Sequence, residues 1–181
     1  GSSMFLFVNR NWRWNILAIS LQYVAVFWLV LTVWPTGLAA VKLVSGWMAG
    51  AVLGSSIPNI DSGFISDQMN KTEISFRIIF GLIILLVIIV IAPGMISLFP
   101  VSLPLILGGS LITGFGLLIV GMASHPIRIV FGLLSIFSGF EVVYAGLEKS
   151  VMVAGFLSLI TLGIALVGAY LLNHNQEVEN S

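Results

Sequence analysis

The sequence predicts an all-α integral membrane protein that crosses the bilayer six times as one domain. Only 8% of its 181 residues are charged and 59% are hydrophobic, whereas about a quarter of the residues in soluble domains are charged. Six apolar stretches, separated by turn-forming or polar segments, approach the roughly 20 residues that a helix needs to cross the hydrocarbon core. We expect the spans at about 12–34, 36–54, 75–92, 102–122, 126–146 and 150–172.

The first span is flanked by Trp12, Trp14 and Trp34 and ends before Pro35. Tryptophan is typical of helix anchors at membrane interfaces. The span is too long and too far along the chain for a cleaved signal sequence, so we expect it to be retained. Residues 1–3 are interpreted as a cloning remnant and residues 4–181 as a single membrane domain.

Glycine at every fourth position characterises the second span, where Gly46, Gly50 and Gly54 share one helix face. In lipid, helices associate through close backbone approach at small residues. The fourth span carries several more, including Gly109 and Gly114, and the sixth span is similar. We therefore expect the second, fourth and sixth spans to be central.

The third span is bulky on all sides, and it is followed by Ala92-Pro93-Gly94. Because it offers no close-packing face, we place it at the lipid boundary and end it at this proline.

Basic residues predict the orientation, because cytoplasmic loops carry an excess of lysine and arginine. With six spans, five basic residues fall on one side and only Lys149 falls on the other. We therefore expect both termini to be cytoplasmic, in a multi-pass protein of the cell (inner) membrane. The five residues are Arg10, Arg13, Lys71, Arg77 and Arg128.

Several classes of function are not indicated by the sequence. There is no cysteine and the net charge is zero, so thiol chemistry is excluded and nucleic-acid binding is not expected. No His, Asp and Glu residues are spaced as metal ligands, and no glycine loop is typical of phosphate binding. We expect no enzyme, no cofactor and no metal. His125 and Arg128 are assigned to a cytoplasmic loop.

Two charged residues lie inside predicted spans. Lys42 shares the glycine face of the second span, and Glu141 lies in the fifth. Both should lie in the outer third of the membrane, because the second span begins at the outer face and the fifth ends there. We predict that they pair, with the Tyr144 hydroxyl added on the same face. Alternatively, the lysine stem brings its charge to the membrane surface. A pair would be either a structural device or part of a proton path.

A resemblance covers about 70 residues of the second half. The stretches LPLILGGSLITGFGLLIVGMASHPIRIVFGLLSIFSGFEVVYAG and LITLGIALVGAYLL resemble the three-helix K-type subunit (chain 4L) of respiratory complex I and the C-type subunit of multisubunit sodium/proton antiporters. The most similar part is His125-Pro126-Ile127-Arg128-Ile129-Val130-Phe131-Gly132-Leu133. Where those families place a membrane carboxylate, this chain has Leu134, and Glu141 follows seven residues later on the same helix face.

The resemblance implies a non-catalytic membrane subunit of an ion-translocating complex, surrounded by lipid and either associated with other membrane subunits or self-associated. Two other classes stay open. One is a self-contained small transporter or channel, which would need an inverted repeat and a hydrated cavity. The other is a structural membrane scaffold in which the charge pair serves packing alone.

Overall fold

A computed structural model describes residues 12–56, 71–98, 101–123, 126–148 and 150–179, and every regular element in these ranges is a helix. Each helix overlaps one predicted span, so the all-α expectation is confirmed for the described chain. The helices are α2 (Trp12–Leu31), α3 (Thr36–Ser56), α4 (Lys71–Leu98), α5 (Leu103–Gly121), α6 (Pro126–Leu147) and α7 (Val151–Glu179).

Five of these helices are long and apolar enough to cross a membrane: α3, α4, α5, α6 and α7. For α2, the apolar part whose side chains are described is Ile19–Leu31, which is shorter than a full span. The described residues therefore support a multi-pass membrane protein. A sixth crossing by α2 stays a prediction.

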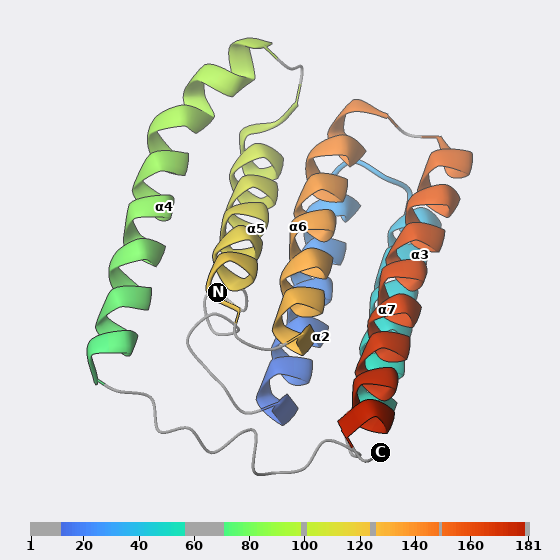
Figure 1. Cartoon of the computed structure of the whole chain (residues 1–181). Coiled ribbons are helices and arrows are strands. Elements are labelled where there is room, and N and C mark those ends of the chain that lie inside the picture. The colour runs from blue at the N-terminus through green and yellow to red at the C-terminus, as the bar shows by residue number, and fades with distance from the viewer. Residues whose placement is uncertain (1–11, 57–70, 99–100, 124–125, 149, 180–181) are drawn as a thin grey trace.

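The helices stand side by side, and helices that follow one another in the chain run in opposite directions (Figure 1). α5 and α6 share the most extensive interface, and α3 and α7 share the next. α2 packs on α3 and α6, whereas α4 packs mainly on α5 at one edge of the bundle (Figure 1). This arrangement places α6 between α5, α7 and α2.

α6 is the most enclosed helix, with 56% of its span buried, whereas 39% of the span is buried in α3 and in α5 and 33% in α7. The sequence predicted the second, fourth and sixth spans as central, so this expectation was wrong in omitting the fifth. Small residues on α6 allow α5 to approach at Gly132 and Gly139 and α2 to approach at Ser135.

α4 lies at the edge of the bundle, as expected of the third span, since only 11% of its span is buried. Its predicted end was wrong, because the helix continues through Pro93 to Leu98. A proline inside a helix removes one backbone donor. In lipid the helix still satisfies the remaining backbone groups, so such a proline is tolerated.

Glycines hold α5 and α6 at backbone contact. A Cβ atom at Gly139 would lie 2.5 Å from the carbonyl oxygen of Gly109, and one at Gly132 would lie 2.9 Å from that of Gly116. The two pairs are seven residues apart on each helix, so the contact extends over two turns. Gly114 faces α4 and not α6, because a Cβ there would lie 2.7 Å from Ile84 on α4.

Candidate functional site

The buried face of α6 carries a row of polar side chains. Ser135, Ser138 and Glu141 follow one another at intervals of three residues, so they lie close to one helix face. All three are buried inside the bundle. Polar groups removed from water need hydrogen-bond partners, and neighbouring helices supply most of them here.

Lys42 on α3 meets Glu141 on α6. The Lys42 Nζ atom donates a hydrogen bond to Glu141 Oε1 at 2.5 Å, and each side chain is only 2% exposed. Lys42 therefore points into the bundle and does not extend to its surface. The two residues lie at matching depths near one end of the bundle, where the Trp34 indole donates to the Glu148 carbonyl at 3.0 Å.

A third helix reaches the same carboxylate oxygen. The Thr161 hydroxyl on α7 lies 3.3 Å from Glu141 Oε1 and 3.1 Å from the carbonyl oxygen of Leu157, so it can donate to either. Its role was not predicted. The available signal was a threonine in an otherwise apolar span, but hydroxyls often bond within their own helix and so do not indicate a site.

α2 contributes an amide to the polar row. Gln22 Nε2 donates to Ser138 Oγ, and Ser135 Oγ donates to Gln22 Oε1, both at 3.4 Å. Gln22 is buried, and sequence reasoning did not select it. An amide deep in a predicted span was the signal that could have done so, because polar side chains in spans usually face other helices.

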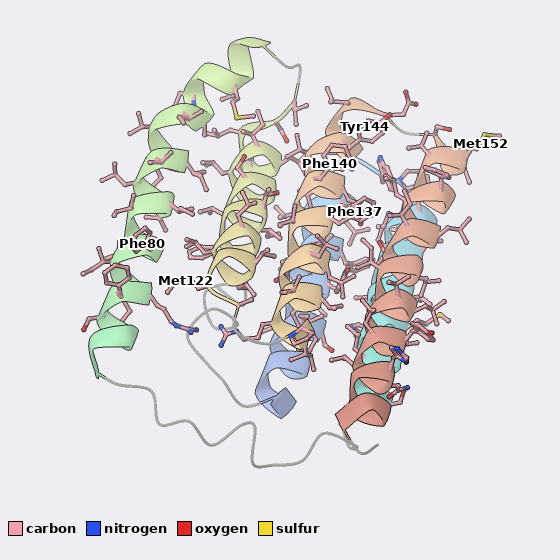
Figure 2. All side chains as sticks on the ribbon, in the orientation of Figure 1. Phe80, Met122, Phe137, Phe140, Tyr144 and Met152 are labelled. Atoms are coloured by element: carbon pink, nitrogen blue, oxygen red, sulfur yellow. The ribbon has the colours of Figure 1, made fainter. Side chains whose placement is uncertain are left out.

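Tyr144 is not the tyrosine at the ion pair. Its ring stacks on Phe140 with centroids 5.7 Å apart, on a partly exposed side of α6 (Figure 2). Tyr144 follows Glu141 by three residues, but its side chain is partly exposed whereas that of Glu141 is buried. The tyrosine that is enclosed inside the bundle is Tyr23 on α2.

Tyr23 lies flat against Gly46 of α3. A Cβ atom at position 46 would overlap the carbon atoms of the Tyr23 ring. Gly46 lies one turn of α3 from Lys42, so the Tyr23 ring packs close to the residue that binds Glu141. Neither the Tyr23 hydroxyl nor Glu141 Oε2 has a hydrogen-bond partner among the described residues, although both atoms are buried.

The polar row lies between two apolar clusters. Along α6, Val130, Phe131 and Leu134 belong to one cluster, whereas Val142 and Ala145 belong to the other. Ser135, Ser138 and Glu141 occupy the positions in between. Apolar layers on both sides separate the ion pair from bulk water and strengthen its electrostatic interactions.

The remaining predicted residues have different surroundings. Gly50 is buried, but a Cβ there would meet only Ser20 Oγ at 3.9 Å, and Gly54 is partly buried. Arg128 was assigned to a loop. It lies in the first turn of α6, because the helix already begins at Pro126. Its side chain is only 6% exposed. His125 lies outside the described residues.

The chemistry available at the site is acid–base chemistry. Glu141 can take up and release a proton, and Lys42 supplies the opposing charge. Among the residues that the structure describes, no three His, Cys, Asp or Glu side chains are grouped to hold a metal ion.

Comparisons of this chain with protein-family models, with curated proteins and with solved structures gave no match. The buried Lys42–Glu141 pair is therefore the feature of the molecule from which a function has to be inferred.

Proposed function

We propose that this chain is a six-span, non-catalytic membrane subunit of a larger ion-translocating assembly, and that its Lys42–Glu141 pair takes part in proton movement. The observation that carries the proposal is the ion pair itself, 2% exposed and enclosed between apolar layers. We place the protein in the cell (inner) membrane with both termini in the cytoplasm. The start of α2 and the end of α7 lie at the same end of the bundle (Figure 1), which supports one side for both termini, and the basic residues favour the cytoplasmic side.

A role beyond packing follows from energetic considerations. An ionisable side chain inside a membrane span costs about 2.5–3.5 kcal/mol on insertion scales. Replacing a buried ion pair with apolar residues of similar volume often stabilises a protein by roughly 1–4 kcal/mol. The glycine contacts between helices already provide close packing here. A pair that stability does not require is best explained by the protonation chemistry of Glu141.

The subunit role rests on the resemblance of residues 103–172 to the K-type and C-type subunits of ion-translocating complexes. Exposed apolar surface on α4 and α7 is compatible with that role. Phe80 on α4 and Met152 on α7 point away from the bundle (Figure 2). Such faces contact either lipid or a neighbouring membrane subunit.

A self-contained transporter is the second candidate, and one observation favours it. The polar row is closed by an apolar cluster on each side. Transporters place their binding sites near the bilayer midplane and open them to one side at a time. In that case, the purified chain would translocate protons or a proton-coupled solute without any partner.

Proton flux in variants tests the role of the pair. Glu141→Gln alone is ambiguous, because it leaves Lys42 without its counter-charge. The informative variant is Lys42→Met/Glu141→Gln, which removes both charges. We expect it to remain folded and to lose proton flux, measured with a pH-sensitive dye in membrane vesicles from cells that carry the native assembly. Tyr144→Phe is the matched control and should keep normal flux.

Normal flux in the double variant would contradict the proposal and leave the pair as a packing device in a structural scaffold. The same dye measurement in liposomes containing only the purified chain separates the first two candidates. A subunit is silent there, whereas a self-contained transporter moves protons.

A further inference from the structure

A second buried hydroxyl lies beside the ion pair, and the proposed function does not use it. The Tyr23 hydroxyl has no hydrogen-bond partner among the described residues, and neither has Glu141 Oε2. The Tyr23 ring packs against Gly46, one turn of α3 from the Lys42 that is bonded to Glu141, and both side chains are enclosed. A donor that lacks an acceptor therefore lies near an acceptor that lacks a donor.

We propose that one water molecule is bound between the Tyr23 hydroxyl and Glu141 Oε2. Buried waters make about three hydrogen bonds, typically to buried polar groups that are otherwise unsatisfied. Glu141 Oε2 accepts from the water, and the Tyr23 hydroxyl can donate to it. In this proposal the third contact is assigned to Ser138, which is buried and lies three residues before Glu141.

Gly46 determines where the Tyr23 hydroxyl lies. Because a Cβ atom at position 46 would overlap the Tyr23 ring, only glycine lets the ring lie flat against α3. Lys42 lies one turn away on the same helix face. Two successive turns of α3 thus carry the cation and the glycine against which the α2 phenol packs, both close to the same carboxylate. This arrangement explains why the glycine stripe and the lysine occur on one face.

The functional consequence of this water site rests on the proposed function, in which Glu141 takes part in proton movement. The water would connect Glu141 with the hydrogen-bonded groups of Gln22, Ser135 and Ser138. Residues 135 and 141 are about 9 Å apart along the helix axis, at 1.5 Å per residue. The path to Glu141 would therefore approach from the first half of α6. When the water carries an extra proton, one of its O–H bonds breaks as an O–H bond forms at Oε2. Tyr23 holds the water and stays neutral.

Infrared difference spectroscopy tests the water site directly. Spectra of the purified protein in lipid nanodiscs are recorded between two pH values, in ordinary water and in H₂¹⁸O. We expect an O–H stretching band in the wild type that shifts in H₂¹⁸O and is lost in Tyr23→Phe. Tyr144→Phe removes the same group from a partly exposed ring and should retain the band. Spectra of Tyr23→Phe indistinguishable from those of the wild type would overturn the proposal.

Thermal unfolding gives a second, independent readout. If the Tyr23 hydroxyl binds a water that is also bound to the carboxylate, Tyr23→Phe lowers the melting temperature. If the hydroxyl has no partner at all, its removal leaves the melting temperature unchanged or raises it, because an unsatisfied buried group is itself unfavourable. An unchanged or raised melting temperature would therefore argue against the water site.

Neither measurement involves proton flux, so the two proposals can fail separately. An isotope-sensitive band that depends on Tyr23, together with normal flux in Lys42→Met/Glu141→Gln, would support the water site and refute the proton path. Proton flux that requires the pair, in the absence of such a band, would support the proton path and refute the water site.

Discussion

The two oxygens of the Glu141 carboxylate have different surroundings. Oε1 accepts hydrogen bonds from Lys42 and Thr161, whereas Oε2 has no partner among the described residues. Such asymmetry suits a group that changes its protonation, because one oxygen is held in place while the other stays available. A carboxylate that served only to fix helix register would be expected to use both oxygens.

Removing one charge of the pair should destabilise the protein far more than removing both. Lys42→Met leaves the Glu141 carboxylate buried without a counter-charge, which typically costs about 3–5 kcal/mol. Lys42→Met/Glu141→Gln should restore most of this loss. Unfolding in detergent micelles, followed by circular dichroism, measures the difference. Equal stability of the single variant and the wild type would mean that the carboxylate is already neutral or solvated.

The glycines of α3 should differ in their tolerance of alanine. Gly46→Ala forces the new methyl group into the Tyr23 ring, and we expect a loss of about 1–3 kcal/mol, as is typical of overpacking. Gly50→Ala is the matched control, since its Cβ would meet only Ser20 Oγ at 3.9 Å. Similar melting temperatures for the two variants would show that Tyr23 moves aside freely.

At the scale of elements, α5 and α6 form the tightest unit of the bundle. Their glycines bring the two backbones together at two positions, and no side chain separates the helices there. Without a hydrophobic force between helices in lipid, such close packing is a main source of association. α6 can therefore hold Glu141 at a fixed place while α3 and α7 bring Lys42 and Thr161 to it.

A methyl group in the α5–α6 contact should be poorly tolerated. A Cβ at Gly139 would lie 2.5 Å from the Gly109 carbonyl oxygen, so Gly139→Ala must push the helices apart. We expect a loss of at least about 1–3 kcal/mol, as for other overpacked positions. Gly163→Ala, in the middle of α7 with nothing within 4 Å of its Cβ, should change stability little. Chemical denaturation in mixed micelles compares the two, and a larger loss for Gly163→Ala would contradict the described packing.

At the scale of the whole molecule, the distribution of charge predicts the orientation in the membrane. Reporters that are active only inside the cell, fused in turn to each end of the chain, should both give a signal, because five basic residues fall on the predicted inner side and one on the outer. A signal from one end alone would indicate an odd number of crossings. In that event α2 would be the helix to re-examine, since its described apolar part is short.

The sequence by itself determined where the helices lie and which charges meet. An apolar segment in lipid must satisfy its backbone groups internally, so each predicted span became a helix. Lys42 and Glu141 are opposite charges at matching depth, and an unpaired charge in a span is too unfavourable to leave alone. The end of one helix was predicted wrongly. Pro93 was expected to end the third span, as a proline often does in water, but α4 continues through it to Leu98.

Only the tertiary structure decided which neighbours each face meets. Glycine spacing predicts a packing face, but it does not distinguish Gly109, which contacts α6, from Gly114, which contacts α4. Tyr144 was selected because it is near Glu141 in the sequence, yet Tyr23, which the sequence analysis did not consider, is the tyrosine enclosed against Gly46, one turn from Lys42. The physical reason is that periodicity fixes the direction of a side chain relative to its own helix. How two helices are paired and rotated depends on packing that involves the whole bundle.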